Sequence, residues 1–366
     1  MNNSFIPGLQ LNGRFYHEIV RSLLDRAFPG LPHSAALIGY GSDVLGYDTT
    51  LSADHNWGPR LQIFLAPIDH ARYGNEIDQW LRRHLPHTFL GYPVNFGEPQ
   101  PDDNGVQQVN VNQESGEVQH RLEITTLPTY VGRYLGLDPT AELDALDWLT
   151  LSEQRLLEIT AGEVYHDGLA ELMPLRAKFA YYPHDVWLYR MAAQWVRISQ
   201  EQAFMGRCGD VGDELGSRLV AARLVRDLMR LAFLLERCYA PYSKWLGTAF
   251  VRLPCGPTLA PLLNQVLDSH PWQARQEPLC AAYLILAEMH NALGIAERVE
   301  PQITDYFNRP YKVFFADALI AATQRQITDP QLRALPPNVG GVDQWVDSTD
   351  VTTEPYLMRK LRNFYS

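Results

Sequence analysis

The feature that most constrains this fold is a change of pattern near residue 127. Before it, segments with strand spacing alternate with segments with helix spacing. After it, helical spacing dominates and strand patterns nearly vanish. A chain of 366 residues suggests about two domains. We therefore predict an α+β domain at 1–140, built on a mixed sheet with flanking helices, followed by an all-α helical domain at 141–366.

The expected elements of the first domain follow from local spacing. Asn12 is placed to cap a helix that continues to Pro29-Gly30. A second helix, around 77–85, is closed by Pro86. Glu114 to Glu117 would form a hairpin turn, and the segment 96–105 reads as a loop because it is rich in Pro, Asp and Gly. Strands are expected at 34–39, 60–65, 108–113 and 118–125.

The second domain is expected to be helical throughout, with prolines between the helices and no fixed repeat. Its predicted helices lie near residues 152–160, 185–203, 214–238, 258–268, 277–293 and 311–326.

Composition narrows the class of protein. The net charge of −11 disfavours broad nucleic-acid binding, which requires many Lys and Arg side chains to neutralise phosphates. The four cysteines are widely spaced, which indicates free thiols rather than a disulfide framework or a zinc site. The N-terminus lacks the pattern of a secretory signal, and the longest apolar run, Leu279 to Ala287, is too short to span a bilayer. We expect a cytoplasmic protein with no membrane partner.

The candidate site lies between residues 36 and 65. Gly41 and Ser42 form a turn directly after a predicted strand, where a glycine lets the backbone approach a phosphate and the Ser42 hydroxyl can bind its oxygens. Asp54 and Asn56 are two residues apart in an extended segment, so both can aim oxygens at one point. Magnesium prefers such hard oxygen ligands and often shares them with phosphates. Glu123, on a later strand, is the best candidate for a third ligand.

A Gly-Ser turn, a spaced Asp-x-Asp-type pair and a later acid on another strand resemble the signature of the nucleotidyltransferase superfamily. More closely, residues 41–46 and 54–60 look like an uncharacterised bacterial family, a domain of unknown function with a nucleotidyltransferase-like N-terminal half. The likeness covers most of the chain, because it continues through residues 147–149, 206–207, 223–227, 239–245, 309–310 and 342–344.

The resemblance implies a nucleotidyltransferase-like fold and a reaction. A nucleoside monophosphate would pass from a nucleoside triphosphate to an acceptor hydroxyl, with release of pyrophosphate. The acceptor would be a small molecule, such as an aminoglycoside-like hydroxyl compound, or another macromolecule. Asp54, Asn56 and Glu123 would hold Mg²⁺, with Asp54 and Glu123 as the catalytic acids and Glu123 alternatively acting as the general base.

One residue departs from the family pattern, which usually carries Asp where this chain has Asn56. An amide oxygen can bind a metal but lacks the full charge of a carboxylate, and one such charge near a dication is worth several kcal/mol. This motivates an alternative function, a catalytically impaired nucleotide-binding or regulatory module. A third possibility is a helical protein–protein scaffold that carries a vestigial domain.

A polar stripe on the helix between Gly216 and Arg237 has two interpretations. It is either a solvated face with an internal Arg–Asp pair, or a face turned to the first domain that binds triphosphate, since arginine matches phosphate with a two-pronged donor. On the second interpretation Arg223 is a phosphate ligand. The residues that share this arc are Arg223, Arg226, Asp227, Arg230 and Arg237.

Two further cations complete the candidate set. Lys244 lies among aromatic residues, where it is either a stem lying over a surface patch or, by resemblance to antibiotic-type nucleotidyltransferases, a triphosphate ligand. Arg60 is a candidate phosphate ligand, with an ordinary structural salt bridge as the alternative.

Overall fold

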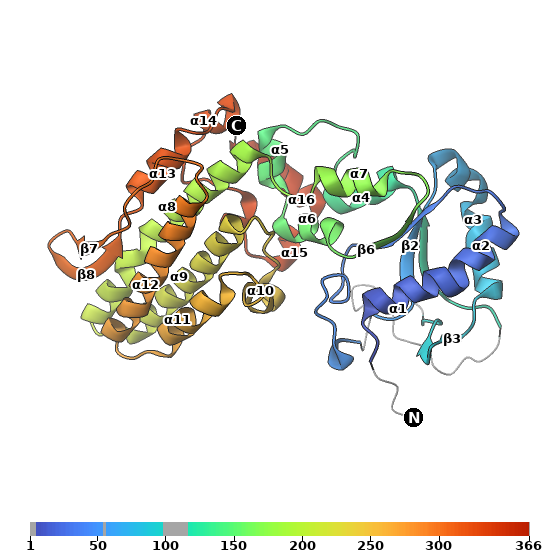
Figure 1. Ribbon diagram of the computed structural model, residues 1–366, viewed down its shortest axis with the longest axis horizontal. Helices are drawn as coiled ribbons and strands as arrows, with labels where there is room; N and C mark the ends of the chain where they lie inside the picture. The colour runs from blue at the N-terminus through green and yellow to red at the C-terminus, as the bar shows by residue number, and fades with distance from the viewer. Residues whose placement is uncertain (1–4, 54–55, 98–115, 366) are drawn as a thin grey trace. The chain divides into compact units, whose positions relative to one another are not determined.

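The computed structural model describes residues 5–53, 56–97 and 116–365. Contacts between Cα atoms divide the chain into two compact units (Figure 1). Unit 1 comprises residues 1–141 and 155–180, and unit 2 comprises residues 142–154 and 181–366. The chain thus leaves unit 1 beside the predicted boundary, and the segment 155–180 belongs to unit 1 again.

Unit 1 is built on a four-stranded mixed sheet with the order β5-β2-β1-β6. The central strand β1 pairs antiparallel with β2 and with β6, whereas β2 and β5 are parallel. In the parallel pair, Arg60 lies opposite Arg121 and Gln62 opposite Glu123. The strands are β1 (Ser34–Leu37), β2 (Arg60–Phe64), β5 (Arg121–Thr125) and β6 (Glu163–Asp167).

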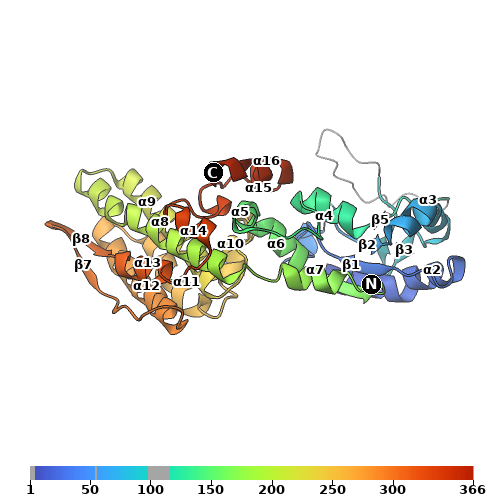
Figure 2. The same cartoon turned by 90° about the horizontal axis from the view of Figure 1, so that it is seen from above.

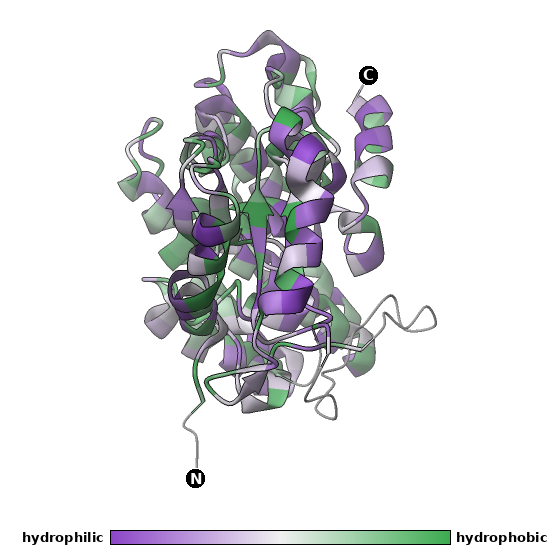
Figure 3. Ribbon diagram, turned by 90° about the vertical axis from the view of Figure 1, so that its right-hand side faces the viewer, coloured by the Kyte–Doolittle hydropathy of each residue, from purple (hydrophilic) through white to green (hydrophobic). Residues whose placement is uncertain are grey.

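One face of this sheet forms the core of unit 1. Leu61 and Ile63 of β2 alternate with the polar residues of the other face, and Leu122 of β5 shares their cluster. A nearly continuous helical segment packs against them, together with a second helix (Figure 1). These elements are α1 (Gly8–Phe15), the π-helical η1 (Tyr16–Val20), α2 (Arg21–Ala27) and α3 (Pro67–His84). In Figure 3 a central strand carries hydrophobic colouring, while the helices around it show large hydrophilic areas.

The opposite face of the sheet is only partly covered. Helix α4 (Leu127–Leu135) places Tyr130 edge-on to Phe64, with ring centroids 5.4 Å apart, at the far end of β2. The end of the same face that begins with Arg60 and Arg121 is left to polar side chains. This uncovered end contains the site described below.

The structure corrects two predictions for unit 1. The first helix begins at Gly8, so Asn12 is not its cap; its buried side chain instead donates to the Gly8 carbonyl and accepts from the backbone N–H of Arg60. The strand β6 was not expected, because strand patterns were thought to end near residue 127. The predicted strand 108–113 lies outside the described residues.

Unit 2 is a bundle of long helices in which α8 packs on α9, and α12 packs on both α9 and α11 (Figure 1). A two-stranded hairpin lies at one end of the bundle. Residues 311–314 are therefore strand rather than the helix that was predicted for 311–326. The principal elements are α8 (His184–Asp210), α9 (Glu214–Leu235), α11 (Gly256–Asp268), α12 (Trp272–Ala292), β7 (Ile303–Tyr306), β8 (Arg309–Phe314) and α13 (Asp317–Gln324).

The end of the chain packs back onto an early helix of unit 2. Arg359 and Arg362 form ion pairs with Asp147, and Arg362 also pairs with Asp144, so α16 lies beside α5 (Figure 2).

The shorter elements are β3 (Thr88–Phe89), β4 (Tyr92–Pro93), α5 (Ala145–Thr150), α6 (Glu153–Thr160), α7 (Leu172–Lys178), α10 (Ser243–Phe250), α14 (Pro330–Ala334), α15 (Thr349–Thr352) and α16 (Pro355–Lys360), with 3₁₀ turns η2 (Thr50–Ser52), η4 (Val342–Gln344) and η5 (Leu361–Tyr365).

The predicted class, α+β with a mixed sheet followed by a helical part, is confirmed. In the described residues, no helix combines the length and the apolar character needed to cross a membrane. The cytoplasmic location stays a prediction.

Candidate functional site

The uncovered end of the sheet in unit 1 forms an open hollow of about 200 Å³. Its polar lining comes from facing positions of two neighbouring strands, because Arg60 and Gln62 on β2 are in register with Arg121 and Glu123 on β5. Residues two apart on a strand share a face, so these four side chains form one polar patch. Tyr40, in the loop after β1, completes the wall.

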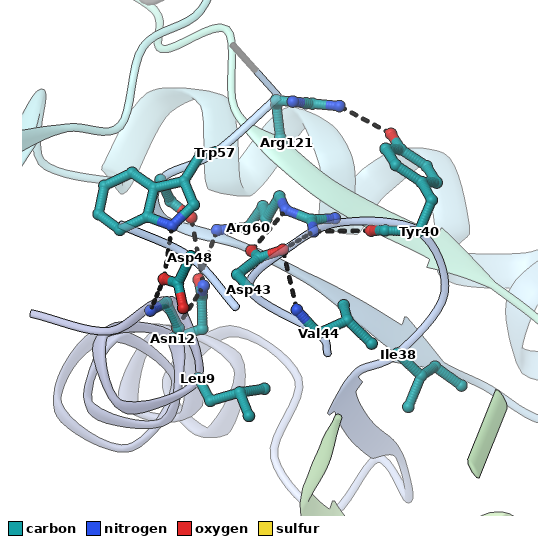
Figure 4. A network of polar contacts seen from close by, with 12 residues as sticks. Leu9, Asn12, Ile38, Tyr40, Asp43, Val44, Asp48, Trp57, Arg60 and Arg121 are labelled. Atoms are coloured by element: carbon teal, nitrogen blue, oxygen red, sulfur yellow. Dashed lines mark hydrogen bonds and ion pairs between the residues drawn. The ribbon is translucent and has the colours of Figure 1, made fainter. Parts of the chain in front are cut away.

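Arg60 is the most deeply placed of these side chains and is paired with an acid. Its Nη2 donates to Asp43 Oδ1 at 2.7 Å and to the Tyr40 carbonyl at 2.9 Å, and its Nε donates to Asp43 Oδ2 at 3.3 Å (Figure 4). Both side chains are almost fully buried. Burial disfavours the charged guanidinium, but Asp43 and Tyr40 together outweigh this effect and raise the pKa of Arg60. Arg60 is therefore firmly charged and its charge is neutralised locally.

The turn after β1 is shaped around this ion pair. Gly41 has a φ of +134°, which non-glycine residues rarely adopt. A Cβ at this position would also collide with Asp43 Oδ1 and Arg60 Nη2. The Asp43–Arg60 ion pair therefore packs closely against Gly41. Ser42 follows directly and is half-buried, with its carbonyl accepting from the N–H of Tyr47 at 2.8 Å.

A second set of hydrogen bonds fixes the loop to the first helix. The Asp48 Oδ2 atom accepts from the backbone N–H of Gly8 at 2.7 Å and from Trp57 Nε1 at 2.9 Å (Figure 4). Asn12 accepts from the N–H of Arg60 at 2.6 Å. The start of β2 and the loop around Asp48 are therefore held by α1, which makes the hollow a preformed feature.

Arg121 differs from Arg60 because no carboxylate pairs with it in the described residues. Its Nη2 donates to the Tyr40 hydroxyl at 2.8 Å (Figure 4). Its guanidinium lies 5.4 Å from the centroid of the Phe96 ring. Within residues 5–53, 56–97 and 116–365, nothing accepts a hydrogen bond from its buried Nη1. Burial lowers the pKa of Arg121, and Arg60 adds to this effect. Among the described residues, no carboxylate therefore compensates the positive charge of Arg121 at the hollow.

Glu123 supplies the negative charge of the hollow and has one strong partner. Arg133 of α4 donates to its Oε1 at 2.5 Å. Arg133 is more than half exposed, whereas Glu123 is one-third exposed. The buried Tyr130 hydroxyl nearby has no hydrogen-bond partner in the part of the chain that the structure describes. Its pKa is raised, first by burial and then by the charges of Glu123 and Glu158.

The predicted metal set is described only in part. Asp54 lies outside the described residues, so its approach to Glu123 stays a prediction. Asn56 has a positive φ of 51°, which asparagine tolerates better than most residues. Among the residues whose placement is described, no group of three His, Cys, Asp or Glu side chains is arranged to hold a metal ion. Of the three predicted ligands, only Glu123 is seen to face the hollow.

The predicted phosphate ligands have different surroundings. Arg60 makes the structural salt bridge that the sequence left open. In unit 2, the exposed Arg223 pairs with Glu201 at 2.6 Å, and Lys244 lies 5.1 Å from the ring centroid of Trp245. The proposal that Arg223 and Lys244 bind a nucleotide stays a prediction, as does the role of Gly41 and Ser42.

The sequence interpretation missed Tyr40, Asp43 and Arg121. A signal for Arg121 was present, because it is two residues before Glu123 on the same predicted strand and must share its face. Asp43 was visible beside the glycine turn, but its pairing with Arg60 depends on how β2 lies against the turn, which spacing alone does not give.

Comparisons with known proteins relate part of the chain to a family model and most of it to a solved structure. Residues 148–246 match a family model described as a domain of unknown function, DUF4037. No curated protein matches the chain. A crystal structure of a nucleotidyltransferase-like protein from Exiguobacterium sibiricum 255-15 aligns with 87% of this chain and 89% of that chain, at 12% identity and a TM-score of 0.32. A TM-score of this size does not establish a shared fold.

Proposed function

We propose that unit 1 binds a nucleoside triphosphate at the hollow and transfers a nucleoside monophosphate to an acceptor hydroxyl, using Mg²⁺. The observation that carries the proposal is the charge of Arg121, which no carboxylate of the described residues pairs with and which lies beside Glu123 on one face of the sheet. A triphosphate brings several negative charges, and a guanidinium with a free donor edge binds phosphate oxygens with two parallel hydrogen bonds.

Each residue of the hollow has a task in this proposal. Arg121 binds phosphate oxygens, while the Asp43–Arg60 pair fixes the glycine turn so that the N–H groups around Ser42 approach the phosphates. Asp54, Asn56 and Glu123 would hold magnesium, whose charge neutralises the phosphates. Oxygen ligands suit this ion, and the Arg133 partner of Glu123 is exposed enough to give way to it.

The chemical step is a substitution at the α-phosphorus. The acceptor oxygen forms a bond to the α-phosphorus, the bond from that phosphorus to the bridging oxygen breaks, and pyrophosphate leaves. If Glu123 is the general base rather than a third metal ligand, it takes the proton of the acceptor hydroxyl. The acceptor is a small hydroxyl compound or a macromolecule.

A second function, nucleotide binding without catalysis, is favoured by two observations. Glu123 is occupied by Arg133, and Asn56 replaces a carboxylate in the predicted ligand set. On this view Arg121 still binds the triphosphate, but no transfer follows.

Binding and turnover separate these functions. Calorimetric titration with nucleoside triphosphates and Mg²⁺ should show binding that Arg121→Gln weakens by about tenfold or more, since a hydrogen bond to a charged group is lost. Arg14→Gln is the matched control, because Arg14 is an exposed arginine of unit 1 that pairs with Glu18 and does not line the hollow. If neither the wild type nor the Arg14→Gln control binds nucleotide, both functions are rejected and the scaffold interpretation gains support.

Transfer is tested with labelled nucleoside triphosphates, Mg²⁺ and cell extract. Label on an acceptor, lost in Asp54→Ala and in Glu123→Gln, supports the transferase. Nucleotide binding that depends on Arg121 without any labelled acceptor supports the binding module. Full transfer activity in Asp54→Ala would remove the proposed metal site.

A further inference from the structure

Unit 2 contains a second hollow, lined from α9, from the start of α10 and from the segment 343–352. The centres of water molecules can occupy about 40 Å³ of this hollow, so it has room for roughly three waters. This space suits the head group of a ligand rather than a whole nucleotide. The side chains that the argument uses are Arg226, Arg230, Ser243 and Asp347.

Two arginines share this hollow, and each forms a long ion pair with an acid. Arg226 and Arg230 are four residues apart on α9, a spacing at which like charges repel. Arg226 lies 3.5 Å from Asp347, and Arg230 lies 3.5 Å from Glu153, so both ion pairs are at the long limit of a hydrogen bond. In the described ranges, the buried Nε of Arg230 has no hydrogen-bond partner.

The surroundings of Arg226 disfavour its charge. Its pKa is lowered, first by burial and then by the neighbouring Arg230. Asp347 is the acid that faces it, and its side chain is 73% exposed. The deeper Asp343 instead accepts from the backbone N–H of Glu153 at 3.1 Å. An incoming anion would therefore compete with an exposed carboxylate and would relieve the repulsion between the arginines.

The start of α10 adds backbone donors to the same hollow, although the N–H of Trp245 in its first turn already donates to the Tyr242 carbonyl at 3.0 Å. The first N–H groups of a helix have no acceptor within it, and they carry the positive end of the helix dipole. No side chain in the described parts of the chain caps α10. The Tyr242 N–H is taken by Gln154 Oε1 at 2.9 Å, and Ser243 begins the helix at the hollow.

We infer that this hollow binds the phosphate group of a small phosphorylated ligand, held by Arg226, Arg230 and the N-terminus of α10. Two guanidinium forks and a helix start supply the donors that a phosphate uses. The segment that matches DUF4037 supplies both arginines and the start of α10. The site is independent of the proposed transferase, because all its residues belong to unit 2.

Calorimetric titration of the full chain with inorganic phosphate at low ionic strength tests the inference. Arg226→Gln and Arg230→Gln should each weaken phosphate binding by about tenfold or more. Arg218→Gln is the matched control, because Arg218 lies on the same helix, pairs with Glu214 and does not line the hollow. Circular dichroism spectra and melting temperatures confirm that each variant folds; Arg226 is partly exposed, so its variant carries the test if the Arg230 variant is unstable.

A variant of opposite sign sharpens the result. Asp347→Asn removes the competing carboxylate and should tighten phosphate binding by about threefold, as expected for an exposed charge. The Arg121→Gln variant of unit 1 should leave this binding in place. The inference is overturned if the wild-type chain binds no phosphate, if Arg226→Gln binds it as tightly as the wild type, or if Arg121→Gln abolishes all phosphate binding.

Discussion

Each unit contains a buried arginine paired with acids, Arg60 in unit 1 and Arg190 in unit 2, and the hydrogen-bonding groups of these two arginines are satisfied to different degrees. In unit 1, Arg60 makes three hydrogen bonds to Asp43 and a backbone carbonyl. In unit 2, Arg190 is equally buried, but it makes one bond of 2.9 Å to Glu153 and lies 3.7 Å from Asp343. Across the described residues, nothing accepts from its Nε or Nη1, although its guanidinium lies 4.5 Å from the ring centroid of Tyr182.

The difference shows what each cluster can do. A closed pair such as Asp43–Arg60 holds one geometry, because each group depends wholly on the other. The cluster of unit 2 spreads its charge over two acids and two arginines, since Arg230 also reaches Glu153. Burial, and then the charge of Glu153, raise the pKa of Asp343 to about 6. The open cluster is therefore able to change its protonation through Asp343.

The largest expected loss of stability comes from breaking the closed pair between Asp43 and Arg60. Arg60→Met leaves Asp43 buried without its partner, and removing one member of a buried ion pair costs about 3 to 5 kcal/mol. Denaturant unfolding would measure the loss, and hydrogen exchange would assign it to unit 1. The control is the double variant Arg60→Met, Asp43→Leu, which should recover much of the loss because no buried charge remains. A loss below 1 kcal/mol would mean that the pair is not the anchor of the turn.

The open cluster should tolerate the same change better. Arg190→Met removes one cation, but Arg230 remains near Glu153 and Asp343 can take up a proton. We expect a loss of roughly 2 kcal/mol in unit 2, less than for Arg60→Met. The same unfolding and exchange experiments measure it. An equal or larger loss than for Arg60→Met would break the comparison.

The pH dependence of stability tests the open cluster directly. The pKa of the Asp343 carboxyl is 3.8 in the unfolded chain and about 6 in the folded chain. Between these values the folded state holds a proton that the unfolded state has lost, so the free energy of unfolding falls as the pH rises from about 4 to 6. The full change is on the order of 3 kcal/mol.

Asp343→Asn removes this titration and keeps an acceptor for the N–H of Glu153. The stability of the wild type relative to this variant should therefore decrease between pH 4.5 and pH 7, measured by urea unfolding at each pH. Other groups titrate alike in both proteins and cancel in the difference. A difference that is constant over this range would show that Asp343 is ionised throughout.

Local patterns of the sequence predicted much of the fold, whereas elements that depend on distant partners were not predicted. Spacing predicted the strands at 34–39 and 60–65 and most of the long helices of unit 2, because local periodicity follows the buried face directly. It missed β6, because this strand forms by pairing with β1, which lies more than a hundred positions earlier in the chain. It also predicted helix at 311–314, where the hairpin partner β7 decides the conformation.

The candidate site was predictable in part for the same reason. Gly41 and Glu123 were found because a turn after a strand and an acid on a strand are local patterns. The positive φ of Gly41 is local too, but its contact with Asp43 and Arg60 is not. That no acid of the described residues pairs with Arg121 depends on the three-dimensional arrangement, which a sequence does not show.

The smallest expected effect concerns the exposed pair between Glu123 and Arg133. Exposed ion pairs contribute little, so Arg133→Gln should change the free energy of unfolding by about 0.5 kcal/mol or less. Because the change frees the Glu123 carboxylate, it should also tighten any Mg²⁺-dependent binding of nucleotide, measured by titration with and without the metal. Glu123→Gln in the same background should remove that gain, since the gain depends on the carboxylate. A loss above 2 kcal/mol in Arg133→Gln would instead place this pair with the closed, structural pairs, and Glu123 would not be available for chemistry.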